Sequence, residues 1–231
     1  GSVGKCVTPP SPSCVTPPSE LVGWWKSDGN ASDSAALNNG EIAGNLIFVP
    51  GKVGQGLRFS GLDASVRVPA ATNLDAGLGD GLTIETWINP DDVQNQQPLV
   101  EWNNGQGFIG THFYLSVPDR EGGAGSLWAN LVDTSGEFHP ISTSTGLVQT
   151  GVFQHVALSY NKASGVASIY LNGSLMVQSN MQSFTPYTSS DLYFGLRPSG
   201  TSTGMRYRGV MDEVSIYKRA LSAGEVAAIY A

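Results

Sequence analysis

The sequence predicts an almost all-β protein, a closed two-sheet antiparallel sandwich that ends in a short helix. Apolar and polar residues alternate over many short segments, and 29 Gly and 13 Pro residues are spread between them at turn spacing. At the C-terminus, residues 209–218 alternate as a strand, and Ser222 with Glu225 forms a capping box that begins a helix. A final strand that pairs beside the first one, with a helix against the edge, indicates a closed sandwich.

Composition limits the number of domains and the classes of partner. A chain of 231 residues, 40% apolar and 13% charged, can bury one full core, so we expect one domain. A net charge of -7 and only 12 Lys and Arg residues provide no basic stripe for a phosphate backbone, which disfavours nucleic acid as a partner. No apolar run approaches the roughly 18 residues that would predict a membrane span.

Residues 1–20 are predicted to be a Pro/Ser/Thr-rich linker, and residues 21–231 to be the compact domain. The linker holds the only two cysteines, Cys6 and Cys14, without the nearby His or second Cys pair that a zinc site needs. We expect a disulfide between them, which would indicate an exported protein. The alternatives are two free thiols, or pairing with a neighbouring domain. Such a leader is typical of one module in a longer secreted chain.

The elements of the domain follow the linker in order. The first strand is predicted at 21–26, and a polar loop to about residue 40 precedes a weak strand near 46–49. Gly54 and Gly56 flank the start of the next strand. Further strands are predicted at 65–69, 82–90, 98–102, 111–117, 126–132, within the hairpin 153–176, at 191–196 and at 209–218. The aromatic residues predicted to pack in the core or at its rim are Trp24, Trp25, Trp87 and Phe194.

Five of these segments, in this order, resemble those of bacterial laminin-G-like (concanavalin A-like) jelly-roll domains. They are LVGWWKSDGNASD, PGKVGQGLRFSG with the following SVRVP, LTIETWINP, GVFQHVALSYNKASGVASIYLNG and GVMDEVSIYKRALSAGEV, which together extend over nearly all of residues 21–231. The resemblance implies a jelly-roll fold, an accessory role in secreted enzymes or surface proteins, carbohydrate or protein as the partner, and often a structural calcium ion. The same fold also carries glycosidases, so it does not decide the function.

A calcium site is predicted in the loop of residues 27–40. The loop offers Asp28, Asn30 and Asp33 at alternating spacing, and hard cations bind several such oxygen ligands. It lacks the bidentate Glu of an EF-hand. The resemblance implies that this loop lies beside the last strand, where Asp212 and backbone carbonyl groups would complete a structural Ca²⁺ site. The alternative is a plain turn with Asx hydrogen bonds.

A carbohydrate site is predicted on one concave face of the sandwich. It needs aromatic rings for sugar C–H groups and polar side chains for hydroxyl groups. Alternation in 111–117 and 126–132 turns the apolar set inward and leaves these candidates outward: His112, Tyr114, Trp128 and Asn130. The loop candidates expected beside them are Glu101, Trp102, Asn103 and Asn104. The alternative for each Trp is ordinary packing.

Three arginines form the only basic concentration of this acidic chain. Arg197, Arg206 and Arg208 lie close together in the sequence. Arg197 is therefore a further candidate ligand-binding residue, suited to an anionic sugar or a carboxylate. The alternative is that these arginines pair with local acidic residues.

The carboxylate pattern of a glycosidase is not found. Retaining glycosidases place two carboxylates on one face of a cleft, whereas Glu85 has no partner on its own strand. Asp212 and Glu213 are adjacent, so they are predicted to point to opposite faces. His155 is predicted to be a structural residue of a strand. No serine elbow, Cys–His set or HExxH motif is present, so we expect no enzyme activity.

These observations predict a non-catalytic carbohydrate-binding module of a secreted or cell-surface protein, with a polysaccharide or other glycan as its partner and other domains of a larger chain beside it. The alternative is an adhesive or structural spacer that contacts other proteins and binds no sugar.

Overall fold

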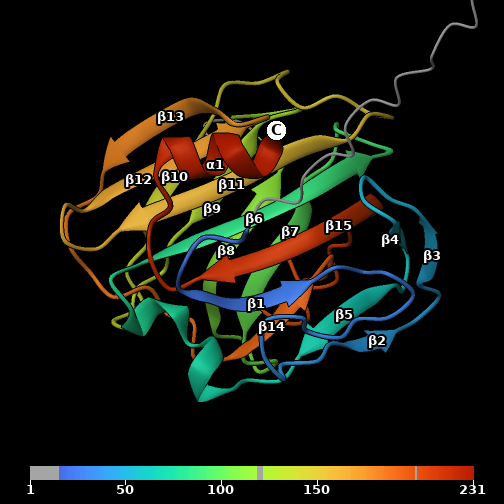
Figure 1. Cartoon of the computed structure of the whole chain (residues 1–231), viewed down its shortest axis with the longest axis horizontal. Helices are drawn as coiled ribbons and strands as arrows, with labels where there is room; N and C mark the ends of the chain where they lie inside the picture. The colour runs from blue at the N-terminus through green and yellow to red at the C-terminus, as the bar shows by residue number, and fades with distance from the viewer. Residues whose placement is uncertain (1–15, 119–121, 201) are drawn as a thin grey trace, which may run out of the picture.

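The computed structural model describes residues 16–118, 122–200 and 202–231, in which two antiparallel sheets form the layers of a β-sandwich (Figure 1). The predicted disulfide between Cys6 and Cys14 lies outside the described residues. Sheet A consists of β1 (Leu21–Trp25), β3 (Ile47–Pro50), β4 (Gln55–Ser60), β6 (Gly81–Pro90), β11 (Gln154–Asn161), β12 (Val166–Leu171), β13 (Ser174–Asn180) and β15 (Arg208–Tyr217). Sheet B consists of β2 (Glu41–Ala43), β5 (Ser65–Val68), β7 (Gln97–Asn103), β8 (Ile109–Leu115), β9 (Leu127–Asn130), β10 (Pro140–Ser142) and β14 (Asp191–Phe194).

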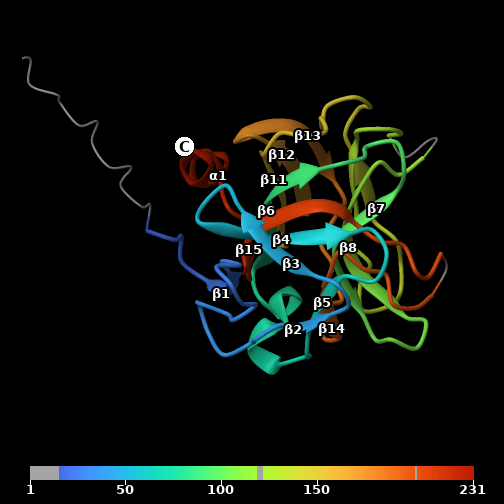
Figure 2. The same cartoon turned by 90° about the vertical axis from the view of Figure 1, so that its right-hand side faces the viewer.

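Strand order confirms the predicted two-sheet jelly-roll sandwich. Sheet A runs β13-β12-β11-β6-β15-β4-β3, with β1 paired to β15, and sheet B runs β10-β9-β8-β7-β14-β5-β2. Figure 2 shows β4, β6 and β15 in one layer and β7 and β8 in the other. The first strand pairs antiparallel with the last, with Leu21 opposite Tyr217, as the sequence predicted. Two short 3-10 turns, Thr72–Leu74 and Ala76–Leu78, connect β5 to β6.

The hydrophobic core lies between the two sheets, and it forms because alternate residues of each strand turn inward. In β6, Leu82, Ile84 and Ile88 lie on one face of the strand and are fully buried. Large side chains from both sheets complete the core: Trp25, Phe59, Trp102, Phe113, Tyr160, Phe194 and Tyr207. Trp25 and Phe194 pack edge to face with ring centroids 5.0 Å apart, which confirms both as core residues.

Helix α1 (Ala223–Tyr230) covers part of the outer face of sheet A (Figure 1). Its predicted capping box is confirmed, since the Ser222 side chain accepts from the Glu225 backbone N–H and the Glu225 carboxylate accepts from the Ser222 N–H. Val226 is buried in a small cluster with outward-facing residues of sheet A, among them Tyr170 and Tyr217. No helix in the described ranges is long and apolar enough to span a bilayer.

The capping box makes a measurable contribution to the docking of α1. Replacing Ser222→Ala leaves the Glu225 N–H without its acceptor, so we expect the free energy of unfolding to fall by about 1 kcal/mol. Urea denaturation followed by circular dichroism measures it. Ser34→Ala, at an exposed serine whose hydroxyl group caps no helix, is the matched control and should leave stability unchanged. Equal stability of the parent and Ser222→Ala would contradict the assigned role of the cap.

Candidate functional site

Four of the predicted sugar-binding residues come together on the outer face of sheet B. In the β8–β9 register His112 lies opposite Asn130, and Tyr114 lies opposite Trp128. The residues between them, including Phe113, belong to the core. The rings of His112 and Trp128 are 5.1 Å apart, and those of His112 and Tyr114 are 5.2 Å apart. The predicted alternation is therefore confirmed within β8 and β9. Val117, which was predicted to turn inward, lies beyond β8 and packs with Tyr114 and Trp128 of the outer face.

The prediction that Trp102 is available at the surface is wrong. Trp102 has 0% exposure and lies in the core between the sheets, opposite the buried Leu192 of β14. Its neighbours Glu101 and Asn103 face outward instead, because alternate residues of β7 occupy opposite faces. The indole of Trp102 thus stabilises the fold and cannot stack on a sugar.

The outer-face cluster of His112, Tyr114, Trp128 and Asn130 is also closed to solvent. Trp128 retains 7% exposure and Tyr114 retains 0%, so neither ring offers the free face that was predicted. The guanidinium of Arg197 lies 4.8 Å from the centre of the Tyr114 ring, and Met205 packs against the same cluster. These side chains act as packing, which was the stated alternative for Trp128.

A buried ion pair holds this cluster together. Arg197 Nε donates to Glu101 Oε2 at 2.8 Å, Asn103 Nδ2 donates to Glu101 Oε1 at 2.7 Å, and the Tyr114 hydroxyl donates to Glu101 as well. Burial raises the pKa of Glu101, and the nearby Arg197 opposes that rise. Arg197 is therefore engaged with an acid of its own chain, as in the alternative reading of the three arginines. Arg208 likewise lies 3.5 Å from Asp91.

The two predicted amide residues Asn103 and Asn104 shape a loop. Asn104 Oδ1 accepts from the backbone N–H groups of Gln106 at 2.8 Å and Phe108 at 3.0 Å. Asn103 Oδ1 accepts from the Gly105 N–H at 2.8 Å and from the Ser199 hydroxyl at 2.7 Å. These bonds fix the loop between β7 and β8 before any ligand arrives.

This loop presents an aromatic residue that the sequence reasoning missed. Phe108 is 38% exposed and packs edge to face on Tyr187, with ring centroids 4.7 Å apart. Gly136 of the β9–β10 loop lies beside the Phe108 ring. A Cβ atom added to Gly136 would be 4.0 Å from the nearest ring carbon. We call Asn104, Gln106, Phe108 and Tyr187 the loop-end surface. The run NNGQGF, in which an aromatic residue ends an amide- and glycine-rich turn, was the available signal.

The four predicted calcium ligands do not converge. Asp33 Oδ1 accepts from the N–H groups of Trp24 and Ala35, and its Oδ2 accepts from Asn38, so this carboxylate closes a turn. Asn30 Oδ1 accepts from the Ser32 N–H. In the part of the chain described, no group of three or more His, Cys, Asp or Glu side chains is placed to hold a metal ion.

Asp28 and Asp212 do approach each other, on either side of the β3–β4 loop. Asp28 Oδ1 accepts from the Gln55 N–H at 2.8 Å, and Asp212 Oδ2 accepts from the Val53 N–H at 2.9 Å. Asp212 is fully buried, and its Oδ1 has no hydrogen-bond partner among the described residues. Burial, with a smaller contribution from the charge of Asp28, raises the pKa of Asp212 to about 6. A cation would satisfy this oxygen, so two of the four predicted side chains fit a metal.

The prediction that Asp212 and Glu213 point to opposite faces is wrong, because β15 has a bulge at this point. Pairing with β6 shifts between Asp212 and Ser215, and Glu213 has a φ of 53°. Glu213 accepts from the indole N–H of Trp24, which is paired with Ser215 on the outer side of sheet A. Burial raises the pKa of Glu213 to about 7, with further contributions from Asp212 and Glu85.

The remaining strand residues considered for catalysis form a buried pair. His155 Nε2 lies 2.8 Å from Glu85 Oε2, and neither side chain is exposed by more than 4%. The ring of His155 also packs against Trp87. Both groups are thus fixed within sheet A, consistent with the structural role predicted for His155.

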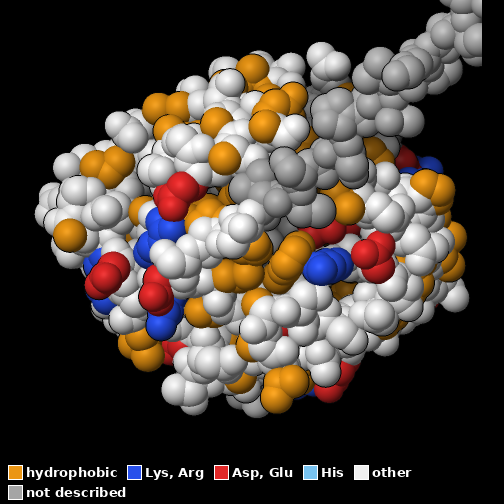
Figure 3. Space-filling model, in the orientation of Figure 1, with side chains coloured by type: hydrophobic (Ala, Val, Ile, Leu, Met, Phe, Trp, Pro, Cys, Tyr) orange, Lys and Arg blue, Asp and Glu red, His pale blue; other side chains and the backbone are white. Residues whose placement is uncertain are grey.

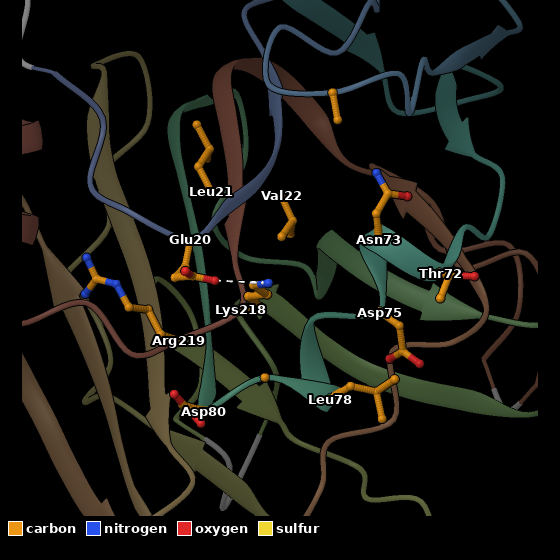
Figure 4. Close-up of a pocket in the computed structure, with 12 residues that line it drawn as sticks. Glu20, Leu21, Val22, Thr72, Asn73, Asp75, Leu78, Asp80, Lys218 and Arg219 are labelled. Carbon is orange, nitrogen blue, oxygen red and sulfur yellow. Dashed lines mark ion pairs between the residues drawn. The ribbon is translucent and has the colours of Figure 1, made fainter.

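A pocket of about 520 Å³ opens at the end of the sandwich where β1 begins and β15 ends (Figure 4). One wall carries the ion pair between Glu20 and Lys218, whose charged atoms lie 3.0 Å apart, and the opposite wall carries Asn73 and Asp75. Arg219 at the rim is paired with Glu225 of α1 at 2.6 Å. No aromatic side chain lines this pocket among the residues described.

The buried His112 gives the protein a specific sensitivity to acid. Burial, with the nearby Arg197, lowers the pKa of His112 from 6.5 to about 3, so the unfolded chain binds its proton at a higher pH than the folded one. The stability that this neutral ring contributes is complete above pH 6.5 and is lost as the pH falls towards about 3.

We expect the melting temperature of the parent to fall more steeply between pH 6.5 and pH 4 than that of His112→Gln, which cannot titrate. Differential scanning calorimetry measures both profiles, and Glu101 remains in both proteins, so its own titration cancels in the comparison. Parallel profiles would show that His112 takes no part in the acid response.

Comparison with known proteins agrees with the two-sheet fold. The sequence profile of the family described as "Concanavalin A-like lectin/glucanases superfamily" matches residues 59–227. Among curated proteins, no match to the sequence was found.

Three similar solved structures show the same fold. Domain 4 of AbnA, an extracellular arabinanase from Geobacillus stearothermophilus solved in complex with arabinotriose, is 18% identical with a TM-score of 0.70, over 92% of this chain and 98% of that one. The binding domain of Paraclostridial Mosquitocidal Protein 1 is 18% identical, with a TM-score of 0.71 over 91% and 52% of the two chains. The binding domain of Botulinum neurotoxin serotype G is 16% identical, with a TM-score of 0.67 over 91% and 50%.

The chain thus spans about half the length of the two toxin domains and nearly the whole of the arabinanase domain. At these identities the likeness concerns the fold, whereas the family profile covers most of the domain described above. The two sheets, the terminal strand pairing and the profile match together place this chain in the concanavalin A-like lectin/glucanase superfamily.

Proposed function

We propose that this chain is a non-catalytic carbohydrate-binding module of a secreted or cell-surface protein, and that a polysaccharide or other glycan binds at its loop-end surface. The single observation that carries the proposal is the exposed ring of Phe108, supported by Tyr187 and flanked by exposed amide side chains. The arabinotriose bound to the similar arabinanase domain supports the same class of ligand.

The chemistry of this surface suits sugars. Sugar C–H groups pack on an aromatic face, and the amide groups of Asn104 and Gln106 can exchange hydrogen bonds with hydroxyl groups. The loop is already ordered by the bonds of Asn103 and Asn104, so binding costs little loop entropy. A shallow surface still buries little ligand area. We expect dissociation constants in the micromolar to millimolar range, roughly -8 to -4 kcal/mol.

The pocket described above suits a sugar less well than the loop-end surface does. The pocket beside Glu20 and Lys218 offers no aromatic face among the described residues, and its cationic groups are already paired with carboxylates of the same chain. A ligand there would have to replace those ion pairs. The loop-end surface requires no such exchange.

The rival function is an adhesive or structural spacer that contacts other proteins. One observation favours it, namely the way the start of the domain is fixed to its end. The Lys218 N–H donates to the Glu20 carbonyl at 3.0 Å, and Arg219 Nε donates to the Ser19 carbonyl at 3.1 Å. The segment that leads into the domain at Ser19 would therefore have a fixed direction relative to the domain, which a structural spacer requires.

We also propose a structural calcium ion between Asp28 and Asp212. Backbone carbonyl groups would complete its coordination, because hard cations bind such oxygen ligands. The orphaned Oδ1 of the buried Asp212 and the proximity of Asp28 support it. When bound, the ion would supply charge neutralisation and would link the first loop to the last strand. Asp33 and Asn30 are not part of the proposed site, because their side chains accept hydrogen bonds from backbone N–H groups of their own loop.

The glycan proposal is tested at Phe108. Phe108→Ala removes the ring while its backbone N–H can still bond to Asn104, so we expect at least about tenfold weaker retention of any glycan that the parent binds, equal to about 1.4 kcal/mol. Affinity electrophoresis in polysaccharide gels, preceded by a glycan array, measures it. Leu62→Ala, at a leucine that is 79% exposed, is the matched control and should bind as the parent does.

Two results would count against the glycan proposal. Retention unchanged in Phe108→Ala would remove the loop-end surface from binding. No retention of the parent by any polysaccharide would favour the spacer.

The calcium proposal is tested by melting. In millimolar Ca²⁺ the parent should melt at a higher temperature than in chelator, because a ligand that binds only the folded state stabilises it by mass action. Asp212→Asn should abolish the difference, and the exposed Asp80→Asn should retain it. If the melting temperature of the parent is the same in calcium and in chelator, the protein has no such site.

A further inference from the structure

We propose that β13 is a self-association edge, through which two copies of this chain pair antiparallel and extend sheet A across a two-fold axis. The proposal is independent of the glycan function. It rests on three observations about β13, namely its backbone, its side chains and its charge.

The backbone of β13 offers an unpaired edge of unusual length. It is the terminal strand of sheet A, and within the described residues its only strand partner is β12. β1 also has a single strand partner, β15, but the following loop covers its backbone, since the Trp24 carbonyl accepts from the Ser34 N–H and the Trp24 N–H donates to Asp33. The terminal strands β3, β10 and β2 are protected in the ways that edges commonly are. β3 has four residues and ends at Pro50, β10 has three and begins at Pro140, and β2 has three and begins at the charged Glu41. β13 has seven residues, without proline or charge.

Apolar side chains are exposed along the same edge. Leu175 is 46% exposed and Met176 is 37% exposed, and six of the seven residues of β13 are exposed. Tyr230 of α1, 40% exposed, lies close to Gly173 at the start of the strand. Figure 1 places β13 at the upper left edge of the molecule, beside α1. A second strand laid along this edge would remove these groups from water.

Charge selects a second copy as the partner. Residues 163–190 contain no Asp, Glu, Lys, Arg or His, although the chain carries a net charge of -7. In Figure 3 the upper left of the visible face, where Figure 1 draws β13, shows hydrophobic and uncharged side chains. Two equally acidic molecules repel least where they meet through an uncharged surface, whereas a charged partner would find nothing complementary here.

Symmetry supports the same partner. Two identical strands can pair antiparallel about a two-fold axis. Both copies then use the same strand, β13, and each contact between them occurs twice. One added strand pair gives a small interface, and we therefore infer a weak dimer that forms at high protein concentration. A dimer would also display two loop-end surfaces, which raises the avidity for a repeating polymer if both engage one chain.

The test is sedimentation velocity of the full chain from about 10 μM to about 1 mM, the range in which a weak dimer dissociates. We expect the average mass to rise from 24.3 kDa towards twice that value. Met176→Lys places two like charges in the pairing edge and should weaken the dimer at least about tenfold. Leu62→Lys adds the same charge at an exposed leucine beyond β4, far from β13 in the strand order, and should associate as the parent does.

A mixture of Met176→Lys with Met176→Glu separates a specific edge contact from a general charge effect. Because the two copies then carry opposite charges in the pairing edge, the mixture should recover the dimer that Met176→Lys alone has lost. Equal melting temperatures of the variants confirm that each is folded. A parent that sediments as a single chain throughout the range would overturn the proposal, and so would a Met176→Lys protein that dimerises as strongly as the parent.

Discussion

The position of β15 within sheet A is the constraint on which the rest of the structure depends. β15 pairs with β1, β4 and β6, so the two ends of the chain and its middle meet on one strand. Its inward side chains, among them Met211 and Ile216, are fully buried, whereas its outward carboxylates meet the β3–β4 loop and Trp24. The strand then leads directly to the cap of α1. Pairing of the last strand beside the first closes the sandwich, and every loop is positioned from that closure.

The two outer faces of the sandwich are closed by different means. On sheet A, α1 covers aromatic side chains such as Tyr217 and stacks Tyr230 on Trp87. On sheet B, Arg197 closes over Tyr114 and is paired with the buried Glu101. Removing a charge from water is costly unless its partners are well placed, and here the carboxylate accepts from three side chains. Such a network suits a fixed structural role better than one that opens to a ligand.

Function is consequently expected at the ends and edges of the sheets. Loops at the end of a rigid sandwich can carry exposed groups without disturbing the core, and the loop that presents Phe108 is ordered by its own asparagines. An edge strand, in turn, has backbone N–H and C=O groups without a strand partner on its outer side. The two proposed surfaces thus differ in kind: the one proposed for a sugar consists of side chains at a loop, and the one proposed for a second copy consists of the backbone of an edge strand.

The sequence by itself determined the class of fold, the terminal strand pairing and the start of α1. Period-two alternation and the Ser222–Glu225 cap are local, because each depends on residues close together in the chain. The terminal strand pairing joins distant residues, and it was expected only because the local patterns indicated a closed sandwich. Alternation also placed His112, Tyr114, Trp128 and Asn130 correctly on one face. It did not reveal the short strands β2 and β10, whose three residues are too few to show a period.

Only the tertiary structure decided what covers that face, which carboxylates meet, and which residues reach the surface. Arg197 comes from a different part of the chain than Tyr114, so the closure of the cluster has no local signal. The bulge at Glu213 reverses the direction that simple alternation assigns, and Asp33 turns out to bond its own loop. Exposure and convergence are properties of packing between distant segments, and alternation along one strand records only which side a residue faces.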